Sequence, residues 1–264
     1  TWSNGTPLTA NDFVYAWQKA IDPETASTYG PYMMGGKIAG AKEITEAASA
    51  GETYDVTTLG VEALDNQTLV VKTAAVMTVD FFKGLMAFGT FLPQNQAFVE
   101  EQGENYATSA DTLLSNGPFK MASWSGTTAT EWTVEKNEDY YDADSVSLTK
   151  ITFNVSKDSQ SAVNTFESGE VDITSKLSSD IVPQYEDDER LVSWLDPRLS
   201  WLKLNEDNEY LANENIRRAI AIAFNKDDLV ADVLNNGSVA ANYVVPADFV
   251  KDEDGNDFRD ANGD

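Results

Sequence analysis

The chain opens with the segment WSNGTPLTANDFVYAW, residues 2–17, which predicts a turn followed by a capped helix. Asn4-Gly5 is a strong turn pair, because glycine adopts a positive φ without steric cost. Thr9 and Asp12 have the spacing of a capping box, with Asp in place of the usual Glu or Gln. Apolar residues then recur four positions apart on one helix face. They are Phe13, Trp17 and Ile21. By itself, this stripe indicates only a helix that packs against a core.

The composition fits a globular protein and excludes several kinds of catalytic site. The 264 residues suffice for one large domain or two to three smaller ones, and a hydrophobic fraction of 42% allows a core. Cysteine and histidine are both absent. This absence removes thiol nucleophiles, Ser-His-Asp triads, Cys/His zinc sites and disulfides within the chain. Carboxylate chemistry and metals with oxygen ligands stay possible.

The charge argues against nucleic acid as a partner. With 44 acidic and 18 basic residues the net charge is -26, whereas phosphate binding requires Lys and Arg. Anionic lipid headgroups are disfavoured for the same reason. A large negative charge suits a well-solvated protein and could also favour cationic ligands.

The sequence contains no signal peptide and no apolar run long enough to span a membrane. Residue 1 already lies inside a structured pattern, and the last residues do not resemble a natural domain end. We therefore expect an internal fragment of a longer protein, for which missing targeting signals carry no information on location.

Further elements follow from periodicity. Residues 61–72 have a hairpin pattern with Asp65-Asn66 at the turn, and a break is expected near Pro93. Strand and helix patterns then alternate, which predicts an α/β sheet with crossovers. The expected strands are 129–136, 151–155, 171–174 and 201–205, and the expected helices are 161–168 and one that Asn215 caps, carrying Ile216, Ile220 and Phe224.

Several short motifs occur in an order that resembles one protein family. The opening segment is similar to the corresponding segment of oligopeptide-binding proteins, the extracytoplasmic receptors of ABC-type peptide importers (extracellular solute-binding protein family 5). Six later segments also resemble family motifs. They are DPETAS at 22–27, LGVEALD at 59–65, SNGPFK at 115–120, EKNEDYYD at 135–142, FESGEVD at 166–172 and NIRRAIAIAF at 215–224. Each string is weak alone, but their joint order and spacing covers almost the whole chain.

The resemblance implies an α/β fold of the type II periplasmic-binding-protein kind, with two lobes around a cleft and an extra domain, here incomplete. It assigns residues 1–94 to the extra (middle) domain, 95–198 to the first α/β lobe and 199–264 to the start of the second lobe.

The function that the resemblance implies is capture of short oligopeptides and their delivery to an ATP-driven membrane importer. It implies a monomer that binds peptides and a membrane permease, with no nucleic acid partner, no cofactor, no metal and no catalytic residue. It also implies an extracellular location, with the full-length protein anchored as a lipoprotein to the outer face of the membrane.

Three segments match positions that line the cleft in the family. Tyr29 matches an aromatic residue of the extra domain that touches the ligand. Thr174, Ser175 and Lys176 match an extended segment that pairs with the peptide backbone, a mode of binding that any peptide sequence satisfies. Ser200 and Trp201 match the crossing between lobes. Ordinary alternatives stay open for Tyr29 as a loop anchor, Lys176 as a solvated charge and Trp201 as a core residue.

Other functions remain alternatives. A receptor of the same fold could take a signalling peptide, a sugar, haem or a metal complex. A carboxylate-based hydrolase is a less favoured alternative, because carboxylate pairs such as Glu167 with Glu170 arise by chance among 44 acidic residues. The acidic stretch 252–257 fails the register of a calcium loop, since Gly255 comes at position 4 instead of 6.

Overall fold

The computed structural model describes residues 1–175 and 177–262. The chain divides into two compact units, Thr1–Val155 and Ser156–Asp264. This division is coarser than the three domains expected from the sequence, and the boundaries near residues 94 and 198 stay predictions. Each unit is described by itself below.

Helix α1 (Ala10–Ile21) begins and ends where the sequence predicts. The Asp12 carboxylate accepts hydrogen bonds from the Thr9 backbone N–H at 2.6 Å and from the Thr9 hydroxyl at 3.1 Å. Trp17 and Ile21 are fully buried, whereas Phe13 is half-buried. The predicted capping and apolar stripe are therefore confirmed.

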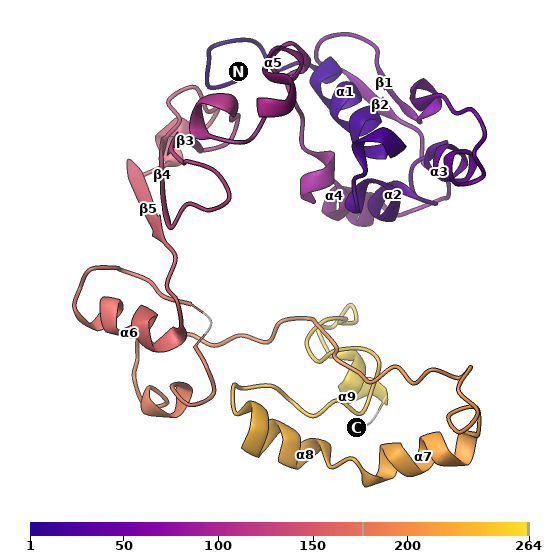
Figure 1. Ribbon diagram of the computed structural model, residues 1–264, viewed down its shortest axis with the longest axis vertical. Helices are drawn as coiled ribbons and strands as arrows, with labels where there is room; N and C mark the ends of the chain where they lie inside the picture. Colours follow the sequence, from indigo (N-terminus) through magenta and orange to yellow (C-terminus); the bar gives the residue numbers. More distant parts are fainter. Residues whose placement is uncertain (176, 263–264) are drawn as a thin grey trace. The chain divides into compact units, whose positions relative to one another are not determined.

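The core of the first unit lies within residues 16–91. Its other elements are α2 (Tyr29–Met34), α3 (Ala41–Ser49), β1 (Val61–Ala63), β2 (Leu69–Val71) and α4 (Val79–Met86), which surround α1 in Figure 1. The buried cluster takes side chains from α1, α2, α3, β1, α4 and the 3₁₀ turn Gly89–Phe91. At its centre Trp17 meets Phe91 edge to face, with ring centroids 5.0 Å apart, and the Trp17 indole N–H donates to the Phe91 carbonyl at 2.9 Å.

Strands β1 and β2 form the predicted hairpin, antiparallel and with Glu62 opposite Val70. The Asp65 carboxylate accepts from the backbone N–H groups of Gln67 and Thr68, both at 2.8 Å, and so forms the turn. The Asn66 carbonyl in turn accepts from the Ala10 N–H at 2.9 Å. The hairpin is thereby tied to the first turn of α1.

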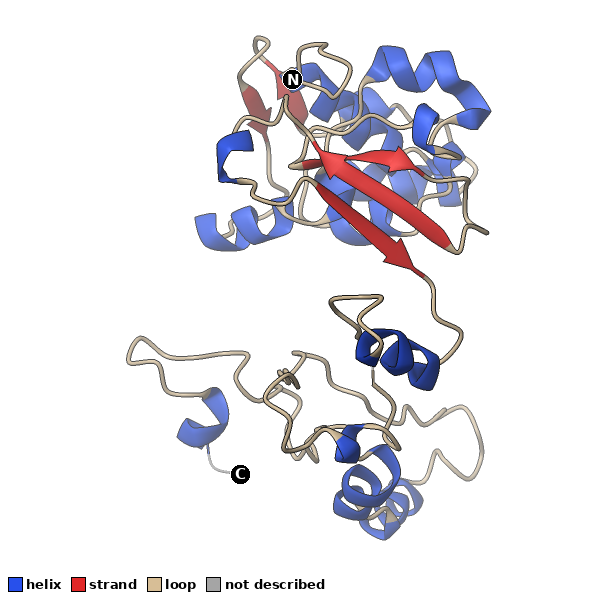
Figure 2. Ribbon diagram, turned by 90° about the vertical axis from the view of Figure 1, so that its left-hand side faces the viewer, coloured by secondary structure: helices blue, strands red, loops and turns tan. Residues whose placement is uncertain are grey.

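The remainder of the first unit contains α5 (Gln96–Gln102) and a sheet of β3 (Phe119–Ser123), β4 (Glu131–Lys136) and β5 (Lys150–Asn154). The three strands are antiparallel in the order β3-β4-β5 and lie side by side in Figure 2. Trp132 and Phe153 are direct cross-strand partners whose rings stack at 5.3 Å. Aromatic pairs of this kind, on one face of neighbouring strands, contribute to the stability of a sheet.

The second unit is poorer in buried apolar side chains. It contains α6 (Ser159–Glu167), α7 (Glu214–Ala223), α8 (Lys226–Asp228) running into a π-helical turn (Leu229–Leu234), and α9 (Phe258–Asn262). Among its described residues, only Val163 and Ile181 are buried hydrophobic residues.

Two expected strands, the expected crossovers and the expected helix cap at Asn215 were wrong. Residues 171–174 and 201–205 form no strand, so the described sheet is an antiparallel meander without the expected crossovers. A strand requires a hydrogen-bonding neighbour, which the alternation of side chains does not supply. Helix α7 is capped by Asn213, whose Oδ1 accepts from the Asn215 N–H at 2.9 Å, and not by Asn215 itself.

Candidate functional site

Tyr29 is the first residue of α2, and the fold presents its ring to solvent. Gly30, the next residue, packs so closely on α1 that a Cβ there would lie 1.7 Å from the Ala20 carbonyl oxygen. The Ser27 hydroxyl accepts from the Gly30 N–H at 3.1 Å. The backbone beneath Tyr29 is thus fixed, while its side chain is 54% exposed.

Tyr29 belongs to an aromatic cluster with Tyr32 and Phe88. Its ring centroid lies 5.3 Å from that of Phe88 and 6.4 Å from that of Tyr32. The Lys37 ammonium donates to the Tyr32 carbonyl at 3.1 Å and lies 5.8 Å from the Tyr32 ring. All three rings are exposed. Exposed, adjacent rings on a fixed backbone can pack against the side chains or the backbone of a ligand.

Tyr32 and Phe88 were not among the residues selected from the sequence. Phe88 lies after α4, which ends at Met86, and directly precedes the 3₁₀ turn that begins at Gly89. The spacing of Tyr29 and Tyr32 along the chain is a signal that could have identified Tyr32, because residues three apart share a helix face.

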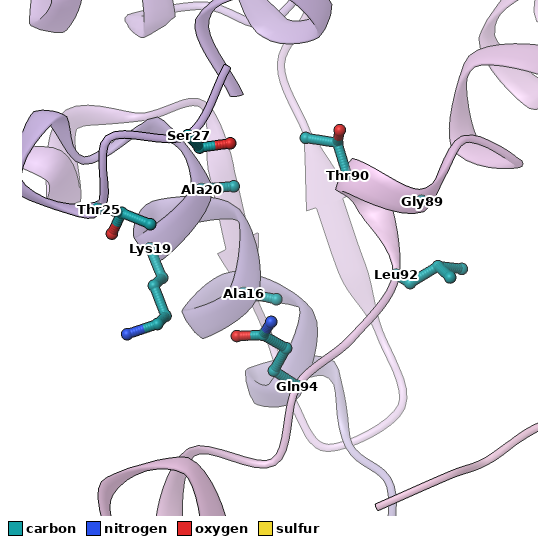
Figure 3. A pocket seen from close by; sticks show the side chains of 9 residues that line it. All are labelled: Ala16, Lys19, Ala20, Thr25, Ser27, Gly89, Thr90, Leu92 and Gln94. Atoms are coloured by element: carbon teal, nitrogen blue, oxygen red, sulfur yellow. The ribbon is translucent and has the colours of Figure 1, made fainter. Parts of the chain in front are cut away.

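A pocket of about 200 Å³ opens in the first unit (Figure 3). Its lining includes Lys19 of α1, Ser27 and Gln94. The Gln94 N–H donates to the Asp12 carbonyl at 3.2 Å, whereas the Gln94 side-chain oxygen is buried with no hydrogen-bond partner in the described part of the chain.

Thr174 and Ser175 follow α6 in a segment without regular secondary structure. Among the described residues, the backbone groups of 172–175 make no hydrogen bond. Thr174 is half-buried and Ser175 is exposed. Unpaired backbone of this kind can pair with an added strand. Lys176, the third residue expected here, lies outside the described residues.

Ser200 and Trp201 lie in an irregular segment of the second unit. Both are exposed, Trp201 by 71%, so the alternative that Trp201 is a core residue is wrong. Within the described residues, no hydrogen bond or ring contact joins Ser200 or Trp201 to Thr174 or Ser175. Tyr29 belongs to the first unit and the other candidates to the second.

The acidic residues serve the local structure in several places. Asp252 accepts hydrogen bonds from the Asn256 side chain and from the backbone N–H groups of Asn256 and Asp254, and these bonds, the Asn256 side chain first, lower the pKa of Asp252. Within residues 1–175 and 177–262, no three His, Cys, Asp or Glu side chains gather as metal ligands. No helix in that part of the chain has the length and apolar character needed to cross a membrane.

The sequence profile described as "Bacterial extracellular solute-binding proteins, family 5 Middle" matches residues 1–264. A dipeptide-binding protein of Lactococcus lactis subsp. cremoris (strain MG1363) is 31% identical over 97% of this chain and 47% of its own length. The chain spans about half the length of the curated relatives it matches.

Solved structures give the same result. The pheromone receptor PrgZ, whose structure addresses its mode of peptide binding, matches 98% of this chain and 50% of its own with 32% identity and a TM-score of 0.82. The oligopeptide-binding protein OppA of Listeria monocytogenes, solved bound to a peptide, matches all of this chain and 50% of its own, with 35% identity and a TM-score of 0.77.

Proposed function

Because the chain belongs to the bacterial extracellular solute-binding proteins of family 5, we propose that the protein captures short oligopeptides and delivers them to an ATP-driven importer in the membrane. Its fold is that of the matched peptide-binding structures, the α/β, type II periplasmic-binding-protein-like fold, of which the chain spans about half. The fold class expected from the sequence is therefore confirmed.

One observation carries the proposal. The peptide-bound Listeria monocytogenes protein matches the whole chain, so the chain is similar along its full length to part of a structure that holds a peptide. The similar dipeptide-binding protein points to the same class of ligand. A sugar, haem or metal complex is not favoured by these relatives, and a signalling peptide belongs to the same class of ligand, as the similarity to the pheromone receptor PrgZ indicates.

In the proposed site, the ligand backbone pairs with Thr174 and Ser175, because their backbone groups have no other hydrogen-bond partner among the described residues. The aromatic cluster around Tyr29, together with Ser200 and Trp201, contacts ligand side chains from exposed positions. Backbone pairing accepts any sequence, so this division of roles accounts for capture of many different peptides.

The domain assignments are part of the proposal. Residues 1–94 form part of the extra domain, which agrees with a buried cluster that draws only on residues 16–91. Residues 95–198 form part of the first lobe and residues 199–264 start the second. Closure of lobes around a peptide would present one shape to the permease.

The matched relatives are substrate-binding proteins, and members of the family are extracellular or periplasmic. Beyond this, we propose that the protein has no catalytic activity, works as a monomer and, in its full length, is anchored as a lipoprotein to the outer face of the membrane.

Calorimetric titration with a mixed pool of tetra- to octapeptides tests the function. The full-length protein is first unfolded and refolded to release ligand that co-purifies. Micromolar or tighter binding without cleavage of the peptides supports the proposal. Absence of heat would overturn it in favour of another ligand, which mass spectrometry of the co-purifying material would identify, and peptide turnover would indicate an enzyme.

Variants test the roles of the residues. Thr174→Pro removes the backbone N–H and is expected to weaken binding by about tenfold or more, whereas Thr174→Val keeps that N–H and is expected to bind normally. Tyr29→Ala is expected to weaken binding, and Tyr141→Ala, which removes a ring that is 90% exposed outside the site, serves as its control.

A further inference from the structure

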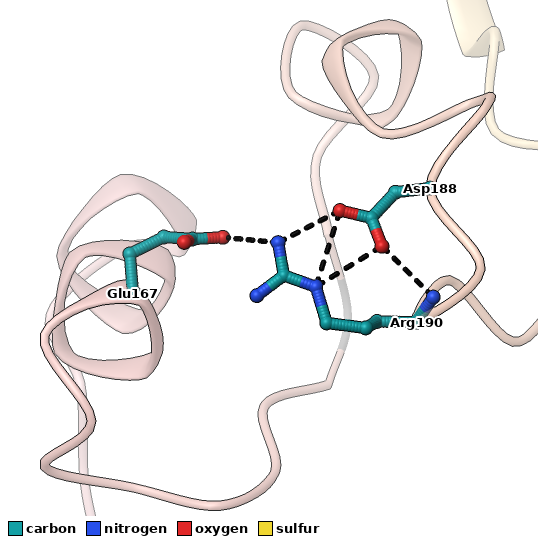
Figure 4. Close-up of polar contacts among 3 residues, drawn as sticks. All are labelled: Glu167, Asp188 and Arg190. Carbon is teal, nitrogen blue, oxygen red and sulfur yellow. Dashed lines mark hydrogen bonds and ion pairs between the residues drawn. The ribbon is translucent and has the colours of Figure 1, made fainter.

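Arg190 forms the centre of a polar network in the second unit (Figure 4). Its Nη2 atom lies 2.9 Å from Glu167 Oε1 and 2.7 Å from Asp188 Oδ2, and its Nε donates to Asp188 Oδ1 at 3.0 Å. The Arg190 backbone N–H also donates to Asp188 Oδ1, at 2.9 Å. The guanidinium carbon lies 5.2 Å from the centre of the Phe166 ring. One side chain thus contacts two carboxylates and an aromatic face.

This network joins two points that are distant in the chain. Phe166 and Glu167 are in the last turn of α6, whereas Asp188 and Arg190 follow the 3₁₀ turn Val182–Gln184. The stretch between them contains Thr174 and Ser175, and Ile181 is its only buried residue among those described. In that described stretch, the backbone hydrogen bonds of residues 178–191 are all local and none reaches α6.

The network is therefore suited to ordering a loop and not to holding the whole unit together. The side chains of Arg190 and Glu167 are 52% and 43% exposed, and exposed ion pairs contribute at most about 1 kcal/mol to global stability. A long stretch with few buried contacts opens locally at low cost, so a cross-link at its ends has a large effect on its order. Order before binding raises affinity, because less conformational entropy is lost when the ligand arrives.

Arginine is needed here for its geometry. Its planar fork satisfies Asp188 in two places while it bridges to Glu167 and lies over Phe166. A lysine ammonium carries the same charge but cannot reproduce a two-point contact and a ring contact together. Arg198, by contrast, pairs only with Asp196, two residues away, and bridges nothing distant in the described chain.

We propose that Arg190 is a positioning residue for ligand binding: by bridging α6 and Asp188 it closes the stretch that carries Thr174 and Ser175 and holds their backbone ready to pair with a peptide. The inference rests on the proposed function, because it assigns Thr174 and Ser175 to the ligand. It adds a residue that touches no ligand and acts through the loop it closes.

The test compares variants of the full-length protein. Arg190→Met removes the charge and keeps the apolar stem, Arg190→Lys keeps the charge, and Arg198→Met is the matched control in the same unit. Each is measured by peptide titration, by thermal unfolding and by hydrogen exchange of residues 168–175. We expect Arg190→Met to weaken binding by about fivefold and to speed exchange in 168–175, with little change in melting temperature. Arg190→Lys is expected to be intermediate and Arg198→Met to match the unmodified protein.

The outcomes separate this inference from the proposed function. If the unmodified protein binds peptides and Arg190→Met binds equally well, the inference is wrong and the proposed function stands. If the unmodified protein binds no peptide, the proposed function fails. Unchanged hydrogen exchange in residues 168–175 of Arg190→Met would in addition refute the role of Arg190 in ordering this stretch. Should Arg190→Met unfold, Glu167→Ala removes the carboxylate through which Arg190 and Tyr185 contact α6 and keeps the pairing of Arg190 with Asp188, and wild-type affinity of that variant would overturn the inference.

Discussion

Gly30 shows how one missing side chain sets the position of a candidate ligand residue. Replacement by alanine would place a Cβ 1.7 Å from the Ala20 carbonyl oxygen, so α2 must move away from α1. We expect Gly30→Ala to destabilise the protein by about 3 kcal/mol or more, measured by urea unfolding. The control is Gly84→Ala in α4, where a Cβ meets nothing within 4 Å. That change is expected to be neutral or to stabilise by about 0.5–1 kcal/mol, and equal losses at both sites would contradict the packing argument.

The Asp188 carboxyl is expected to make the stability of the second unit depend on pH. The Arg190 side chain and then its backbone N–H donate hydrogen bonds to Asp188 and lower its pKa to about 2. Since an unperturbed Asp has a pKa of about 3.9, the interaction contributes fully above about pH 5 and is lost as the pH falls toward 2. The neighbouring charges are Glu167 on α6 and Glu186, Asp187 and Glu189 in the same loop.

Urea midpoints of the protein and of Asp188→Asn, measured from pH 7 to pH 2, check this expectation. The two midpoints are expected to differ by only a small amount at neutral pH, because this exposed pair adds little to global stability, and to converge as the pH approaches 2. Asp172→Asn controls for the loss of one negative charge in the same unit. A difference that grows on acidification would show that Asp188 does not favour its charged form in the folded protein.

The residues of the site were predictable to different degrees. Tyr29 was found through a sequence motif, but its ring partners Tyr32 and Phe88 depend on how α2 packs against the segment after α4. Arg190 could not be found from the sequence at all. Its contacts with Glu167 and Phe166 connect positions more than twenty residues apart, and such pairings leave no local pattern.

At the scale of elements, α4 depends on a single cap. The Thr78 hydroxyl accepts from the Phe81 N–H at 3.2 Å, and the short helix contributes Leu85 to the core. We expect Thr78→Ala to destabilise the protein by about 1 kcal/mol, because the hydroxyl satisfies a backbone donor that the helix cannot. Urea unfolding measures the loss. Thr78→Ser keeps the hydroxyl and is expected to retain most of the stability, so an equal loss in both variants would contradict the capping role.

Helices and hairpins were predicted well because their signals are local. The cap at Thr9, the turn at Asp65 and the stripe of Trp17 and Ile21 all depend on residues within a few positions of one another. The strands expected at 171–174 and 201–205 failed because pairing is a long-range property. Short alternating runs fit an extended backbone but do not specify a partner strand.

At the scale of the whole molecule, apolar burial is concentrated in the first unit. The cluster around Trp17 and Phe91 is a continuous core, whereas Val163 and Ile181 are the only buried hydrophobic residues among those described in the second unit. Composition alone predicted that a core could form, but not where. Helix α7 illustrates the difference, since its apolar residues Ile216 and Ile220, with Phe224 directly after the helix, recur as in α1 but remain at least 36% exposed.

This contrast predicts unequal hydrogen exchange within the chain of residues 1–264. Helices α1 and α7 have similar lengths, 12 and 10 residues, but α1 buries five residues and α7 none. A helix of this length is marginal in water without packing, so we expect α7 amides to exchange at least about 100-fold faster than those of α1. Mass spectrometry of peptides from both helices at several protein concentrations measures the ratio. Equal protection at all concentrations would show that the apolar face of α7 is buried within the chain, and protection of α7 that rises with concentration would show that copies of the chain cover it.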